Sequence, residues 1–268
     1  MTRIFRERDA NPQVLAQRTI AVIGYGNQGR SQALNLRDRG ARVIVGNIED
    51  EYKRRAQEDG FEVFPIGEAA RQADVLFLLL PDEVAAEVFA RDIVGQLQPK
   101  NAVVFASGYN VAYGLVQCPS FVDVLLLAPR MIGIGVRELF LSGEGFYSFL
   151  GVHQDASGEA WPVLLALADG IGTLKKGALE VSFKMEAELD LFNEQGFGPA
   201  FGRVLLTAVQ TLLDAGYPKE VVLLELYMSG EFGYICREIA NTGLIQQLEF
   251  HSQTSQYARF PEVFAFSE

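Results

Sequence analysis

Short apolar runs alternate with amphipathic segments through the first 180 residues of the chain. The runs are rich in Val, Ile and Leu and too short for helices, which is typical of strands buried on both faces of a parallel sheet. They predict strands at residues 19–23, 42–46, 75–80, 102–106, 124–128 and 149–152, with a further short segment at 61–64. The amphipathic segments predict helices at residues 28–39, 53–59, 83–89 and 159–169. Alternating strands and helices indicate an α/β fold with a doubly wound parallel sheet.

The pattern changes after Gly177, where the apolar positions follow a helical period and strand-like runs become few. Helices are predicted at residues 181–195, 201–215 and 218–240, with Gly216 just past one helix and Pro218 opening the next. We therefore expect two domains, an α/β domain at residues 1–180 and a smaller all-α domain at residues 181–268.

The first predicted strand runs directly into a glycine-rich loop, I-A-V-I-G-Y-G-N-Q-G at residues 20–29. In a G-x-G-x-x-G loop the first glycine permits a tight turn, the second lets the backbone approach a pyrophosphate, and the third lets helix and strand pack closely. The following helix offers its unpaired N–H groups to the phosphates. The loop therefore predicts a Rossmann-type dinucleotide site that uses Gly24, Tyr25, Gly26, Asn27, Gln28 and Gly29.

Charge and composition narrow the range of partners. The net charge is −11 and 49% of the residues are hydrophobic. These values argue against nucleic acid or an anionic membrane as a partner and allow a substantial core. No apolar stretch is long enough to span a bilayer, and the charged start does not resemble a signal peptide. The two cysteines, Cys118 and Cys236, fit reduced thiols, so we expect a cytoplasmic protein.

A group of carboxylates marks the helical region. Asp190 and Glu194 are four residues apart and share one helix face, and Glu225 and Glu231 lie on a later segment. Like charges at this spacing destabilise a helix unless a cation lies between them. Hard cations such as Mg²⁺ bind a few carboxylates together with water and substrate oxygens. Each acid taken alone is equally consistent with a solvated surface charge, so only the combination with a nucleotide domain favours a metal site.

Several strings together resemble the short class of ketol-acid reductoisomerases over residues 14–257. These strings are V-I-G-Y-G-N-Q-G at 22–29, A-L-N-L-R-D at 33–38, L-L-P-D-E at 79–83, V-H-Q-D-A-S-G at 152–158, D-L-F-N-E-Q at 190–195 and T-S-Q-Y at 254–257. The resemblance implies an NAD(P)H-dependent and Mg²⁺-dependent reaction on a 2-acetolactate-type keto acid, in which an alkyl group migrates and the new ketone is reduced. It also implies an intertwined, knotted-type helical domain that joins a homodimer or larger oligomer.

The resemblance assigns roles to individual residues. Asp190 and Glu194 match the metal-binding carboxylates of the family, Glu225 matches an acid contributed by the second subunit, and Ser252 matches a serine that contacts substrate. The remaining residues expected to bind the cofactor are Asn47, Asp50, Leu80, Pro81, Asp82, Ser107 and Gly133.

Four departures from the family pattern concern the chemistry. Ser107 stands where the family has a histidine, and serine cannot shuttle protons near neutral pH. Arg130 stands where the family has its catalytic lysine, and arginine keeps the charge but cannot release a proton. Ser229 stands where the fourth carboxylate is expected, and Glu231 replaces it only if two residues are inserted. The family also continues with further helices beyond the position of Glu268, so part of the active-site cover is expected to lie there.

Three functions therefore remain open. The first is a ketol-acid reductoisomerase, which the retained acids favour. The second is a homologue that only reduces a ketone or imine in specialised metabolism, and the third is a non-catalytic nucleotide-binding relative.

The loop after the second strand bears on the choice of cofactor, because Glu49, Asp50 and Glu51 can accept hydrogen bonds from free ribose hydroxyls and repel a 2′-phosphate. We therefore expect NADH in preference to NADPH, although the bases at residues 53–55 would favour a phosphate. Broad apolar stretches at 204–206 and 221–224 support an oligomer.

Overall fold

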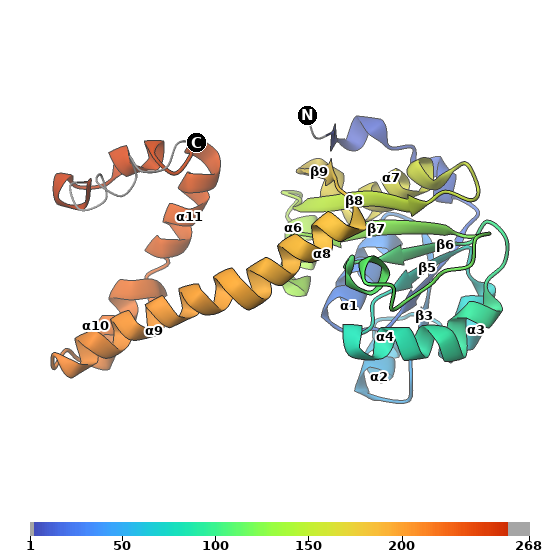
Figure 1. Ribbon diagram of the computed structural model, residues 1–268, viewed down its shortest axis with the longest axis horizontal. Coiled ribbons are helices and arrows are strands. Elements are labelled where there is room, and N and C mark those ends of the chain that lie inside the picture. Colours follow the sequence, from blue (N-terminus) through green and yellow to red (C-terminus); the bar gives the residue numbers. More distant parts are fainter. Residues whose placement is uncertain (1–2, 257–268) are drawn as a thin grey trace. The chain divides into compact units, whose positions relative to one another are not determined.

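The computed structural model describes residues 3–256, and the chain divides into two compact units, Met1–Leu191 and Phe192–Glu268. The first unit is built around a sheet of nine strands (Figure 1). In sequence order these are β1 (Ile4–Phe5), β2 (Thr19–Ile23), β3 (Arg42–Gly46), β4 (Val63–Phe64), β5 (Val75–Leu78), β6 (Ala102–Phe105), β7 (Asp123–Pro129), β8 (Tyr147–Gln154) and β9 (Gly177–Glu180).

The spatial order of the strands is β1-β9-β8-β7-β6-β5-β2-β3-β4. All pairs from β4 to β7 are parallel, as predicted, and so is β8 with β9. The pairs β7–β8 and β1–β9 are antiparallel, so the sheet is mixed. The short strands β1 and β9 were not expected from the sequence, because neither forms a long apolar run.

The helices of the first unit cover both faces of the sheet, which confirms the doubly wound α/β class. They are α1 (Asn27–Asp38), α2 (Glu51–Glu58), α3 (Ile66–Gln72), α4 (Asp82–Val88), α5 (Tyr109–Ala112), α6 (Gly133–Leu141), α7 (Ala160–Ile171) and α8 (Phe183–Leu191). Short turns of helix complete the unit: η1 (Glu7–Asp9), η2 (Pro12–Leu15), η3 (Phe89–Ile93), η4 (Val94–Gln96) and η5 (Thr173–Lys175).

Two hydrophobic cores lie on the two sides of the sheet because successive strand residues point to opposite faces. In β2, for example, Ile20 and Val22 join one core and Ala21 and Ile23 join the other. The first core includes residues of α1 and α7, and the second includes residues of α3 and α4. Every residue of β2 is buried, which explains why its sequence shows no polar alternation.

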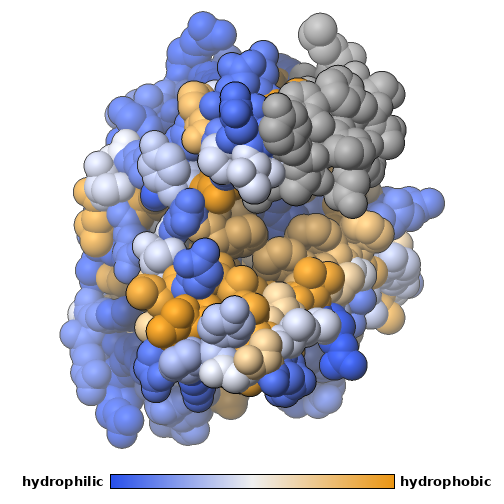
Figure 2. Space-filling view, turned by 90° about the vertical axis from the view of Figure 1, so that its left-hand side faces the viewer, coloured by the Kyte–Doolittle hydropathy of each residue, from blue (hydrophilic) through white to orange (hydrophobic). Residues whose placement is uncertain are grey.

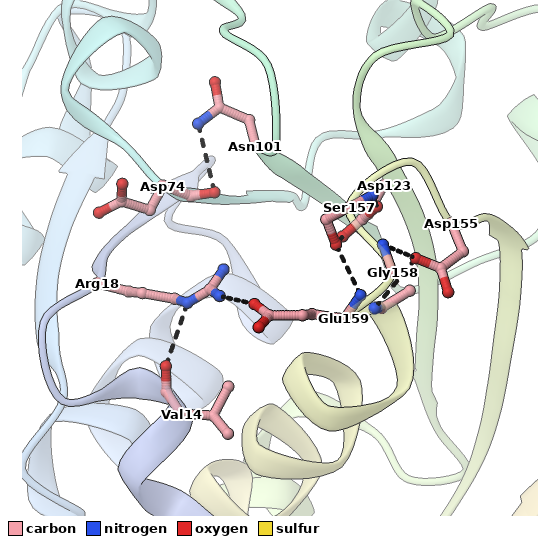
Figure 3. A network of polar contacts seen from close by, with 10 residues as sticks. Val14, Arg18, Asp74, Asn101, Asp123, Asp155, Ser157, Gly158 and Glu159 are labelled. Carbon is pink, nitrogen blue, oxygen red and sulfur yellow. Dashed lines mark hydrogen bonds and ion pairs between the residues drawn. The ribbon is translucent and has the colours of Figure 1, made fainter.

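A polar network at the amino end of β7 explains the string V-H-Q-D-A-S-G (Figure 3). Buried Asp123 accepts hydrogen bonds from the backbone of Ala156, at 2.8 Å, and from the hydroxyl of Ser157, at 2.6 Å. Asp155 accepts from Gly158 N–H at 2.8 Å. These bonds fix the loop between β8 and α7 at the sheet edge opposite the glycine-rich loop, so the string belongs to the scaffold.

The second unit is helical over its described part. It contains η6 (Phe192–Phe197), α9 (Gly198–Asp214), α10 (Lys219–Leu223), η7 (Leu224–Met228), α11 (Glu231–Thr242) and η8 (Gln246–Phe250). The helix predicted at 218–240 is interrupted after η7, because Gly230 takes a left-handed conformation with φ of 80°. No helix within residues 3–256 is long and apolar enough to cross a membrane.

Candidate active site

The glycine-rich loop has the geometry that a pyrophosphate site requires. Gly24 follows β2 with φ of 91°, and a side chain there would lie 2.6 Å from the carbonyl oxygen of Leu79. Gly29 packs directly on the carbonyl of Gly24, so helix α1 starts against the strand. Gly26 behaves differently, because a Cβ built on it meets no atom within 4 Å. The loop is therefore closed on its protein side and open beside Gly26, where a phosphate can approach.

Three of the loop's neighbours hold it in place. The Asn47 side chain accepts a hydrogen bond from Tyr25 N–H at 3.2 Å, and the Gln28 side chain donates one to the carbonyl of Met131 at 2.9 Å. Helix α6 begins at Gly133, whose backbone packs on Asn27 too closely for any side chain. The Gln28 side chain and the close packing of Asn27 on Gly133 thus join the loop to the segment that follows β7.

The loop after β3 carries the acids that were expected to select the cofactor. Asp50 is the N-cap of α2, and its carboxylate accepts from Tyr52 N–H at 2.9 Å and from Lys53 N–H at 3.0 Å. The same oxygen accepts from the Asn47 side chain at 2.7 Å. The Lys53 ammonium pairs with Glu49, so the nearest base is bound to an acid of the same loop. One carboxylate oxygen of Asp50 thereby remains available to a ribose hydroxyl.

The ends of β5 and β6 bring four more predicted residues to the same edge. Leu80 and Pro81 follow β5, and Asp82 begins α4. The Asn110 side chain donates to Asp82 at 2.7 Å. Burial raises the pKa of Asp82, as do the charges of Glu83 and Asp190, while the Asn110 hydrogen bond lowers it. Ser107 follows β6, and its hydroxyl accepts from Tyr109 N–H at 3.2 Å.

Arg130, at the end of β7, lies in the centre of a charged cluster. Its guanidinium donates to Glu186 at 3.1 Å and to Asp190 at 2.9 Å. The guanidinium carbon also lies 5.0 Å from the centre of the Phe149 ring. The positive charge that stands for the family's lysine is therefore held directly on a carboxylate that was predicted to bind metal.

Glu186 is the residue of this cluster that sequence reasoning missed. Its side chain is fully buried, and it accepts from the backbone N–H of Gly108 at 2.5 Å as well as from Arg130. Burial raises its pKa to about 6, against the opposing effects of Gly108 and Arg130. The sequence did contain a signal, because Glu186, Asp190 and Glu194 repeat every four residues along one helix face.

The remaining predicted residues lie in the second unit and are exposed. Glu194 lies on η6 and Glu225 on η7, which are both π-helical segments, and Glu231 begins α11. The hydroxyl of Ser252 accepts a long hydrogen bond, 3.4 Å, from Ser255 N–H. Within residues 3–256 of one chain, no three His, Cys, Asp or Glu side chains are grouped to hold a metal. The assignment of the four carboxylates to metal therefore stays a prediction.

The fold and the glycine-rich loop define a Rossmann-type, nucleotide-binding protein. Comparison with known proteins is more specific. The profile of the acetohydroxy acid isomeroreductase NADPH-binding domain matches residues 14–177, and that of the ketol-acid reductoisomerase C-terminal domain matches residues 183–265. The chain therefore belongs to the ketol-acid reductoisomerase family of NAD(P)H-dependent oxidoreductases.

Individual relatives agree with this assignment. A provisionally named ketol-acid reductoisomerase 3 of Saccharolobus solfataricus is 46% identical over 96% of this chain and 79% of its own length. A ketol-acid reductoisomerase (NADP(+)) of Methanopyrus kandleri is 42% identical over the same shares of the two chains. The structure of an NADH-preferring ketol-acid reductoisomerase from an uncultured archaeon superposes with a TM-score of 0.91 and 34% identity, covering 97% of this chain and 80% of that one.

Proposed function

We propose that this protein converts a 2-acetolactate-type keto acid by alkyl migration followed by reduction of the new ketone with NADH. One observation carries the proposal: the glycine-rich loop, Asp82, Ser107 and the Arg130 cluster all follow the carboxyl ends of parallel strands. Such ends meet at one edge of a sheet, where ligands of doubly wound folds bind. A cofactor site and a charged reaction site therefore share this edge.

The residues of this edge have separable tasks in the proposed reaction. The loop around Gly26 and the first turn of α1 hold the pyrophosphate, and the ends of β5 and β6 place the nicotinamide. Arg130 offers hydrogen-bond donors and positive charge to an oxygen that becomes negative during reduction. It cannot supply the proton itself, because a guanidinium stays charged throughout the working pH range.

The donor set fits a hard divalent cation. We assign Asp190 and Glu194 as its ligands, with Glu225 and Glu231 contributed by a second copy of the chain. Asp190 uses one oxygen for Arg130 and keeps its other oxygen, and Glu194 makes no ion pair with any residue of the described range 3–256. Bound Mg²⁺ would polarise adjacent substrate oxygens during alkyl migration.

The second unit supports the proposal of a homodimer or larger oligomer. Large apolar side chains are exposed along α9, with Val204 at 68% and Leu206 at 65% of full exposure. The face shown in Figure 2 also carries broad hydrophobic areas. Surfaces of this kind mark association sites, and a second copy would in addition supply Glu225. A cytoplasmic location is a further part of this proposal.

The preference for NADH rests on the loop after β3. Asp50 is fixed as the N-cap of α2, so its negative charge lies where a 2′-phosphate would have to be placed. Two of the three bases that could attract this phosphate are paired with acids, since Lys53 pairs with Glu49 and Arg54 lies 3.9 Å from Glu58. The third, Arg55, has its guanidinium carbon 5.8 Å from the centre of the Tyr52 ring. The archaeal neighbour described as NADH-preferring is consistent with this preference.

A second function, reduction without isomerisation, is favoured by the contact between Arg130 and Asp190. A guanidinium on a metal-binding carboxylate weakens its attraction for a dication, and alkyl migration depends on metal more than hydride transfer does. Ser107 and Arg130 also remove two proton-transfer groups that the family has.

One assay separates the two functions. NADH oxidation is measured with 2-acetolactate and with the already isomerised 3-hydroxy-2-keto acid, each with and without Mg²⁺. A reductoisomerase consumes both substrates and needs Mg²⁺ for the first. Turnover of the isomerised acid alone would establish the reductase, and NADH binding without any turnover would establish a non-catalytic relative.

A further inference from the structure

Asp59, the C-cap residue directly after helix α2, makes a set of contacts that the proposed reaction does not use. Its carboxylate accepts from the hydroxyl of Tyr25 at 2.9 Å and from the guanidinium of Arg30 at 2.7 and 3.0 Å. Tyr25 is part of the glycine-rich loop, and Arg30 lies one turn into α1. One side chain at the end of α2 therefore holds both the loop and the helix that follows it.

The other end of α2 is tied to the same loop residue. Asp50, the N-cap of α2, binds the Asn47 amide at 2.7 Å, and Asn47 in turn accepts from Tyr25 N–H at 3.2 Å. Tyr25 is thus connected to the start of α2 through its backbone and to the end of α2 through its hydroxyl. Its ring is fully buried and packs edge-on against Phe61, with 5.7 Å between ring centres.

We propose that Tyr25 and Asp59 are positioning residues that hold the pyrophosphate loop in register with the N-terminus of α2. That N-terminus is where the adenosine ribose is expected, so the pair would fix the separation of two subsites of one dinucleotide. The inference rests on the proposed function only in requiring that the loop binds NADH. The Tyr25 side chain is buried against Phe61, so it acts through the loop, whose backbone is expected to bind the pyrophosphate, and Asp59 acts through α1 and α2.

The protonation states of Tyr25 and Asp59 keep the hydrogen bond between them intact across the working pH range. Burial and Asp59 raise the pKa of Tyr25, so its hydroxyl stays protonated and donates at all working pH values. The Arg30 hydrogen bonds lower the pKa of Asp59, which therefore stays ionised and accepts. Removing the hydroxyl leaves Asp59 bound to Arg30 and leaves the ring in its site. The substitution Tyr25→Phe therefore removes the link between the loop and the end of α2 without disturbing the packing of the core.

The experiment compares ligands that span both subsites with one that occupies a single subsite. Tyr25→Phe is expected to weaken binding of NADH and of ADP-ribose by about tenfold, the range for a hydrogen bond to a charged group. The inhibition constant of adenosine is expected to stay within about twofold of wild type. A general loss of structure would instead weaken the binding of adenosine together with that of NADH and ADP-ribose.

A second pair of variants provides the matched control. Asp59→Asn is expected to weaken NADH binding like Tyr25→Phe, and the double variant no more than the stronger single one. Glu58→Gln removes the same charge from the neighbouring position, where Glu58 and its partner Arg54 are exposed, and is expected to bind NADH normally. Unchanged NADH binding by Tyr25→Phe, or an equal loss for adenosine, would overturn the inference. Failure of the wild type to bind NADH would instead overturn the proposed function.

Discussion

Helices α7 and α9 are both rich in apolar residues, yet they differ in how far these residues are buried within one chain. Ten of the 12 residues of α7 are buried on the sheet of the first unit, whereas none of the 17 residues of α9 is buried. Helix α7 of the nucleotide-binding unit thus buries its apolar side chains within one chain. Helix α9 of the helical unit does not, and its exposed Val204 and Leu206 fit the proposal that a second copy covers them.

Cofactor binding by the glycine-rich loop is expected to be separable from the metal-dependent chemistry assigned to the carboxylates, and Asp190→Asn tests this with the largest expected effect. Loss of the carboxylate should reduce Mg²⁺-dependent turnover by about a thousandfold, since metal polarisation contributes several kcal/mol. The dissociation constant of NADH should remain close to wild type. Glu188→Gln on the same helix, where Glu188 is exposed and lies 3.7 Å from Lys184, is the control. Normal Mg²⁺-dependent activity of Asp190→Asn would contradict the metal assignment.

Truncations of one buried and one exposed leucine should distinguish the two units directly. Leu125→Ala in β7 removes a fully buried side chain and should lower the free energy of unfolding by about 2–5 kcal/mol. Leu206→Ala in α9 should cost less than about 0.5 kcal/mol in dilute solution and more as the protein concentration rises. Chemical denaturation at two protein concentrations measures both. A concentration-independent loss at Leu206 would show that α9 is buried within one chain.

A charge on α9 should break the oligomer. Val204→Glu places a carboxylate on the exposed apolar surface, and its burial between copies should weaken association by about a hundredfold. Light scattering should then report a single chain where the wild type gives a dimer or larger species. Leu141→Glu makes the same kind of change at an exposed residue of the first unit and should leave the assembly intact. A wild type that is monomeric and fully active would refute the dimer.

Buried Glu186 should make the stability of the first unit depend on pH. Its pKa in the folded state, about 6, lies above its ordinary value of 4.5, so the folded protein binds the proton more tightly. The resulting stabilisation, up to about 2 kcal/mol, is complete below pH 4.5 and is lost as the pH rises through 6. Unfolding measured between pH 4 and 7 should show this slope, and Glu186→Gln should remove it. An equal slope in both proteins would contradict the assignment.

The smallest expected effect concerns cofactor choice within the nucleotide-binding unit. Asp50→Ser removes the charge beside the expected position of the ribose but retains an N-cap for α2, so the fold should be unaffected. The ratio of kcat/KM for NADH over NADPH should fall by about tenfold. A wild type that prefers NADPH, with the preference unchanged by the substitution, would show that the acids of this loop do not select the cofactor.

Local pattern accounts for a large part of the fold. The strands at residues 19–23 and 42–46 were predicted to the residue, since a buried parallel strand is a continuous apolar run between turn residues. The glycine-rich loop was recognisable because each of its three glycines is required by the local geometry of a single strand-turn-helix unit. Helix ends such as Asn27 and Asp38 differ from the prediction by one residue, within the fraying of any helix end.

Contacts between distant segments could not be predicted in this way. Strand β9 exists because β1 and β8 pair with it, and the antiparallel direction of β8 follows from its pairing with β7 rather than from its own residues. The sequence by itself determined the alternation of elements, the nucleotide loop and the acids of the helical region. Only the tertiary structure decided that Arg130 would pair with Glu186 and Asp190, because residues 56 and 60 positions apart meet only when the sheet edge and α8 are packed together.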